Sequence, residues 1–151
     1  MLALLFRLGT EHFALDLAGL TAILPNSRIR PIPHAPAEVC GEFNWRGRMV
    51  PVIDLRRMFF GEDCEWHLTT RLVVFRWQGA TQRGNVALRA EGITDTVEYR
   101  AADVQKPSLA DPERPGFVGT LVGDGKVVRL LDPQALVWDR FHDVLFREAA
   151  P

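Results

Sequence analysis

The sequence predicts an all-β protein made of small packed barrels or a sandwich. About nine or ten short apolar or alternating runs follow one another along the chain, with turn signals at regular intervals. No long helical pattern separates these runs, which argues against a doubly wound parallel sheet with its long crossover connections. The 151 residues suit one domain, or two small barrels that share an interface.

The first half of the chain is predicted to contain two hairpins joined by a segment at a sheet edge. A turn at Gly9 separates the first two strands, and Pro25 ends the third. Pro31 and Pro33 cannot donate backbone hydrogen bonds, so they confine their segment to an edge. The predicted strands cover residues 2–8, 12–17, 20–24 and 29–33, helical turns cover 36–39 and 55–60, a hairpin covers 41–55 and a loop covers 61–68.

The second half is predicted to hold further strands and a terminal helix. Three prolines make residues 106–116 the longest irregular connection. Asp132 is suited to cap a helix over residues 133–146, with Pro133 at its first position. We expect one domain over residues 1–151, with sub-barrels at about 10–70 and 71–131 and the strand 2–8 and the helix outside them. The predicted strands cover residues 71–75, 85–89, 93–99, 117–122 and 126–131.

The hairpin over residues 41–55 is the most informative stretch. Two apolar runs flank a polar turn in which Arg46 is followed directly by Gly47, a sequence typical of a tight hairpin. A guanidinium on such a turn is presented at fixed geometry, and its planar fork suits carboxylates and backbone carbonyls. Trp45 has two open interpretations: buried, it braces the turn, and exposed, it contacts a partner.

Composition limits the classes of function. Hydrophobic residues make up 47% and charged residues 25% of the chain, which is typical of a globular protein with a core. The net charge of −1 provides no overall field to attract nucleic acid or an anionic membrane. No apolar run approaches the roughly 20 residues of a membrane-spanning helix. Cys40 and Cys64 are too few for a disulfide framework, so we expect reduced thiols in a cytoplasmic protein.

No pattern selects a catalytic, cofactor or metal centre. Neither serine lies in a nucleophile elbow, and no second pair of ligands completes a zinc site with Cys64 and His67. Residues 123–126 lack the spacing of a phosphate-binding loop. An enzymatic or small-molecule-binding barrel and a barrel that binds single-stranded nucleic acid remain alternatives. The carboxylates suited to capping, or to acid–base pairing, are Asp16, Asp54, Glu91 and Asp95.

One motif gives the chain a family resemblance. The run from Asn44 to Gly47 has the form Asn-x-Arg-Gly, and residues 50–56 follow it with the sequence VPVIDLR. With scattered matches along nearly the whole chain, this motif resembles the CheW-like adaptors of bacterial chemosensory systems. The resemblance implies two packed five-stranded SH3-like β-barrels without enzymatic activity or cofactor. It also implies a scaffold between the cytoplasmic tip of a methyl-accepting chemoreceptor and the regulatory domain of a CheA-type histidine kinase.

The same resemblance implies two sets of binding residues. The first set surrounds the Arg-Gly turn, where such adaptors contact kinase or receptor, and comprises Asn44, Trp45, Arg46, Gly47 and Arg48. The second set falls at positions that line a groove between the barrels, where an amphipathic receptor helix docks, and comprises Leu20, Ile23, Leu72, Val86 and Ile93.

Three residues depart from the family pattern. Trp45 replaces an aliphatic residue, Ala22 stands where an acid is common, and Ala87 replaces a glycine. The short N-terminus and lone domain are similar to adaptors of accessory systems, such as the WspB type used in surface sensing. Self-association in receptor arrays is a further expectation from the resemblance.

Overall fold

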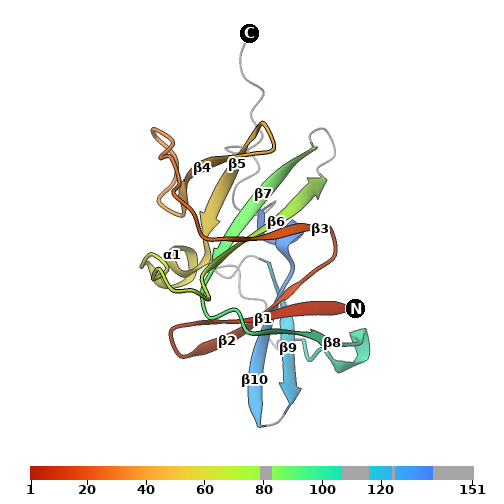
Figure 1. Cartoon of the computed structure of the whole chain (residues 1–151). Helices are drawn as coiled ribbons and strands as arrows, with labels where there is room; N and C mark the ends of the chain where they lie inside the picture. Colours follow the sequence, from red (N-terminus) through yellow and green to blue (C-terminus); the bar gives the residue numbers. More distant parts are fainter. Residues whose placement is uncertain (79–82, 107–115, 124, 138–151) are drawn as a thin grey trace.

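The computed structural model describes residues 1–78, 83–106, 116–123 and 125–137. Within these ranges the chain is mainly β, as predicted, and a short helix α1 (Leu55–Phe60) and a 3₁₀ turn η1 (Ala101–Asp103) accompany the strands (Figure 1). The strands are β1 (Leu2–Leu8), β2 (Glu11–Asp16), β3 (Leu20–Pro25), β4 (Val39–Trp45), β5 (Arg48–Asp54), β6 (Arg71–Gln78), β7 (Arg83–Ala90), β8 (Asp95–Glu98), β9 (Phe117–Gly123) and β10 (Lys126–Leu131).

These strands form two five-stranded sheets, which confirms the predicted fold class. The first sheet has the order β8-β1-β2-β10-β9, and the second has the order β3-β6-β7-β5-β4. Most neighbours are antiparallel, but β2 with β10 and β5 with β7 run parallel. A parallel pair needs a long connection, so each sheet joins segments that are distant in the sequence.

The sheets correct the predicted division of the chain at residue 70. The first sheet combines the two ends of the described chain, residues 2–16 and 95–131, while residues 20–90 supply the second. The strand 2–8 is therefore a central member of the first sheet and not an addition to it. Hydrophobic periodicity indicates that a strand exists but not which distant strand becomes its neighbour.

Several local predictions also differ from the structure. Residues 29–33 form no strand, and only Arg30 makes a bridge, with Glu42. Strand β8 is shorter than predicted because the N–H of Ile93 donates to the carbonyl of Thr69, away from the sheet. Residues 133–137 are helical, whereas the rest of the predicted helix, most of the connection 106–116 and Asp124 lie outside the described residues.

The largest apolar cluster lies between the two sheets. Phe6 and Phe13 enter it from the first sheet, Phe75 and Leu88 enter it from the second, and Leu136 closes it from the helical residues. Each sheet also encloses a smaller cluster of its own on its other face. The inter-sheet core therefore fixes the two sheets against each other through buried apolar side chains.

Strand β6 shows how one strand serves two of these clusters. Val73, Phe75 and Trp77 point into the inter-sheet core, while Leu72 and Val74 point into the cluster inside the second sheet. Successive side chains of a strand alternate between faces, so a strand covered on both faces needs a continuous apolar sequence. Residues 72–75 provide that sequence.

Candidate functional site

A two-residue turn joins β4 and β5 and carries the predicted arginine. Trp45 pairs with Arg48 across the hairpin, which leaves only Arg46 and Gly47 as the loop. Their φ angles are 54° and 82°, and two positive φ values are typical of the type I′ turn of tight hairpins. The N–H of Gly47 donates to Oδ1 of Asn44 at 3.0 Å, which closes the turn.

Arg46 occupies a backbone conformation that its side chain does not favour. A residue other than glycine at positive φ costs on the order of 1–3 kcal/mol and persists where the surrounding structure holds it there. Asparagine or glycine would suit this position better on backbone grounds alone. The backbone conformation therefore does not explain why an arginine stands at this position. The feature that an arginine adds there is its exposed guanidinium.

The structure answers the question left open for Trp45. This side chain is half-buried and packs against the cluster inside the second sheet, so it braces the hairpin. Its ring also supports a neighbour, because Cζ of Arg46 lies over the ring at 4.7 Å from the centroid. Trp45 thus touches both the interior of the sheet and the exposed arginine.

The hairpin tip, residues 44–48, presents a cationic surface. Asn44, Arg46, Gly47 and Arg48 are all exposed. Neither Arg46 nor Arg48 forms an ion pair with a carboxylate in the described part of the chain. The structure brings this predicted set together, as expected for five consecutive residues around one turn.

The sequence reasoning omitted Met49, which adds an apolar group to the tip. It is 47% exposed and pairs with Asn44 on the face of the hairpin opposite Val50 and Val52. Residues 49–52 are all apolar, so the sequence gives no apolar–polar alternation here, and the available signal was the geometry of a strand, in which Met49 faces away from Val50 and its neighbour two residues on.

The five residues of the predicted groove do not share one surface. Leu20 and Ile23 lie on the edge strand β3 and are each 38% exposed, and Ile93 is half-buried against the inter-sheet core. Leu72 and Val86 are 0% exposed and belong to clusters on opposite faces of the second sheet. In this conformation Leu72 and Val86 cannot contact a docked partner. They can affect its binding only by supporting the packing of the strands that carry the exposed residues.

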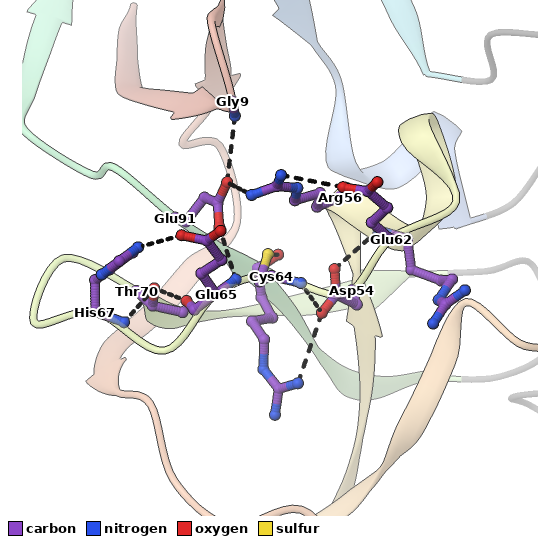
Figure 2. Close-up of polar contacts among 11 residues, drawn as sticks. Gly9, Asp54, Arg56, Glu62, Cys64, Glu65, His67, Thr70 and Glu91 are labelled. Atoms are coloured by element: carbon purple, nitrogen blue, oxygen red, sulfur yellow. Dashed lines mark hydrogen bonds and ion pairs between the residues drawn. The ribbon is translucent and has the colours of Figure 1, made fainter.

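Asp54 is buried at 0% exposure and serves the fold. Its Oδ1 accepts the N–H of Arg57 and caps α1, which Gly61 ends with a φ of 74°. Its Oδ2 accepts the N–H of Cys64 at 3.0 Å and lies 3.6 Å from Nη1 of Arg89 (Figure 2). These partners satisfy both oxygens, which leaves Asp54 poorly suited to act as a general base.

Glu91 follows β7 and joins the two sheets. Oε1 accepts from Nη1 of Arg56 at 2.6 Å and from the N–H of Gly9 in the first sheet, while Oε2 accepts the N–H of Glu65 (Figure 2). Such a saturated carboxylate holds segments in place. Glu91 and Asp54 thus act as separate structural groups and not as the acid–base pair weighed from the sequence.

The two thiols are not activated as nucleophiles. Burial raises the pKa of Cys40 from 9.0 to about 11, and burial also raises the pKa of Cys64, so both thiols are protonated at neutral pH. Among the residues that the structure describes, no three His, Cys, Asp or Glu side chains gather closely enough to hold a metal ion. No described helix has the length and apolar character to cross a membrane.

Comparison with protein families identifies this architecture. A family model described as the CheW-like domain matches residues 2–140. The chain belongs to the CheW-like family. The motif around Arg46 therefore lies within a domain that covers nearly the whole chain.

Individual proteins of the CheW family are also similar to this chain in sequence. The chain is 29% identical over 129 residues to the chemotaxis protein CheW of Rhizobium meliloti (strain 1021), covering 84% of this chain and 81% of that relative. It is 43% identical over 54 residues to the chemotaxis protein CheW of Treponema pallidum (strain Nichols), but this match covers only 36% of the chain and 32% of the relative.

A solved structure shows the same fold. The crystal structure of the scaffolding protein TtCheW from Thermoanaerobacter tengcongensis superposes with a TM-score of 0.73, covering 86% of this chain and 87% of that one. The sequence identity is 21%, so this likeness concerns the fold alone. The CheW-like fold predicted from the sequence is thereby confirmed.

Proposed function

We propose that this CheW-like chain is a non-enzymatic adaptor that couples a methyl-accepting chemoreceptor to a CheA-type histidine kinase. Family membership and the relatives named chemotaxis protein CheW support the general role. The observation that carries the proposal in this chain is the exposed Arg46 on a rigid two-residue turn. A cytoplasmic location is part of the proposal, because the receptor tip that the adaptor would bind is cytoplasmic.

The sheet order suits a protein that holds two partners at once. The hairpin of β4 and β5 lies at one edge of the second sheet, and β3 forms the other edge. Leu20 and Ile23 on β3 present apolar surface, which fits an amphipathic helix, whereas the tip presents arginines, which fit carboxylates. The proposal requires that these two chemically different surfaces, which lie on different strands of the sheet, be occupied together.

The adaptor then acts by geometry. Within the second sheet, the hydrogen-bonded strands β6, β7 and β5 connect β3 to the hairpin. A partner docked on β3 is therefore held at a defined distance from a partner docked on the hairpin tip. A ligand-dependent change in the receptor would reach the kinase through this rigid connection, and the adaptor itself would carry out no reaction. Membership of a WspB-type accessory system and self-association in arrays stay predictions.

Reconstitution tests the coupling directly. The chain, a receptor cytoplasmic fragment and the CheA-type kinase encoded in the same genome are combined, and sedimentation and kinase autophosphorylation are measured with and without the chain. We expect a ternary complex and receptor-dependent kinase activity only when the chain is present. Binding to neither partner, or mutually exclusive binding of the two, would contradict the proposal.

A further inference from the structure

The hairpin tip combines two exposed arginines with one aromatic ring. Arg46 lies over the ring of Trp45, and Arg48 stands directly across the hairpin from Trp45 in the strand register. We propose that these three residues form a binding tip for an acidic peptide segment, in which Trp45 is a positioning residue that orients the Arg46 guanidinium toward a partner carboxylate. This inference rests on the proposed function and names the chemistry of the partner at that site.

The turn fixes where the Arg46 side chain begins. Arg46 and Gly47 both have positive φ, and the Asn44 side chain ties down the N–H of Gly47. A free arginine side chain loses about 2 kcal/mol of rotamer freedom when it is immobilised. With its backbone held by the turn and its guanidinium resting on Trp45, Arg46 has already lost part of that freedom before binding. Preorganisation of this kind strengthens association.

The contact with the ring does not use up the donors of the guanidinium. Cζ of Arg46 lies over the ring of Trp45 at 4.7 Å from its centroid. A guanidinium has five N–H donors, and those that the ring does not cover can pair with the two oxygens of a carboxylate. Trp45 itself is anchored in the cluster inside the second sheet, so the platform does not depend on the partner.

The charges of the chain favour an acidic occupant. Neither arginine of the tip forms an ion pair inside the described ranges, although both are exposed. Five arginines have carboxylate partners within 4.0 Å, namely Arg56, Arg57, Arg89, Arg100 and Arg129. Other exposed arginines also lack an ion pair among the described residues, but Arg46 and Arg48 stand at one two-residue turn. Two arginines at one turn are complementary to a segment that carries at least two Asp or Glu side chains.

A peptide titration tests the inference without the natural partner. A short fluorescein-labelled peptide of alternating alanine and glutamate is titrated with the full chain, while NMR follows the Nε–H signals of Arg46 and Arg48. We expect these two signals to shift on binding, and Trp45→Leu to weaken binding roughly twofold to fivefold, as for an exposed cation–π contact. Trp45→Phe should recover part of the loss, because a smaller ring still supports the guanidinium.

A second substitution separates positioning from direct contact. In an Arg46→Ala background, Trp45→Leu should cost much less affinity than it does in the wild type, because the ring has no guanidinium left to orient and only its packing in the hairpin is lost. Arg100→Ala removes an exposed arginine between β8 and η1, and Figure 1 shows β8 at the other end of the molecule from the β4–β5 hairpin. It is the matched control and should bind normally. Equal Trp45→Leu losses with and without Arg46, or no loss at all, would overturn the assignment of Trp45.

The outcomes also distinguish this inference from the proposed function. Peptide binding that depends on the tip, in a chain that fails to bind kinase and receptor, would retain the acidic-peptide site and reject the adaptor role. Kinase or receptor binding that ignores Trp45→Leu and Arg48→Ala would retain the adaptor role and reject the site. Tighter binding of oligothymidine or of phosphatidylglycerol vesicles than of the glutamate peptide would reject an acidic partner.

Discussion

Asp54 shows how one buried side chain connects several backbone segments. It caps α1 through the N–H of Arg57, receives the N–H of Cys64 from the following loop and faces Arg89 of β7. The sequence predicted a capping role because an aspartate at a strand end precedes a short helical pattern. It could not predict the contacts with Cys64 and Arg89, since these depend on how the loop folds back onto the sheet.

Asp54→Ala should destabilise the protein by about 2–4 kcal/mol. The substitution removes a helix cap, leaves the N–H of Cys64 without its acceptor and removes the carboxylate that faces the half-buried Arg89. Urea unfolding monitored by circular dichroism measures the change in free energy. Asp63→Ala is the control, because it breaks an exposed ion pair with Arg57 and should leave the unfolding midpoint nearly unchanged. Equal midpoints for wild type and Asp54→Ala would contradict this role.

The β4–β5 hairpin is the element that the sequence predicted best. Its two strands and its turn follow from local chemistry, namely two apolar runs around the polar turn at Arg46 and Gly47. The neighbouring segment at residues 29–33 was predicted less well, because its pairing is not local. Only Arg30 pairs with β4, and it does so at Glu42, beside the register shift between Val39 and Gly41.

Gly41→Ala tests this packing at the hairpin. Gly41 has a φ of 146°, and a Cβ there would lie 2.2 Å from the carbonyl oxygen of Arg30. Backbone must move to relieve that contact, so we expect a loss of more than about 2 kcal/mol in unfolding free energy. Gly123→Ala on β9 is the matched control, since no atom lies within 4 Å of its added Cβ. Equal stability of the two variants in thermal unfolding would refute the predicted clash.

At the scale of the molecule, the sequence predicted two five-stranded units but not their composition. The parallel pairs β2–β10 and β5–β7 bring distant segments together, and nothing in the local pattern of apolar residues encodes those partners. The predicted binding residues likewise separate into a local set and a set that depends on distant strands. The motif around Arg46 is contiguous and was found whole, whereas the groove residues come from separate strands, and Leu72 and Val86 proved to be fully buried.

The shared core predicts that the two sheets unfold together. Phe75 and Trp77 of the second sheet pack in the same cluster as Phe6 and Phe13 of the first, so neither sheet can open without exposing the core of the other. Urea unfolding followed by circular dichroism and by tryptophan fluorescence should therefore give coincident transitions, and Phe75→Ala should shift both probes equally. Two separated transitions would show that the sheets are independent units.

The most direct test of the adaptor account is the affinity of the chain for the regulatory domain of its CheA-type kinase and for the receptor tip, measured by isothermal titration calorimetry. Arg46→Ala should weaken at least one of these associations by roughly 1–4 kcal/mol, as expected for an interface arginine, while circular dichroism shows an unchanged β spectrum. Arg100→Ala, which removes an exposed arginine from the segment that follows β8 of the other sheet, should bind both partners as the wild type does. Wild-type affinity of Arg46→Ala for both partners would contradict the account.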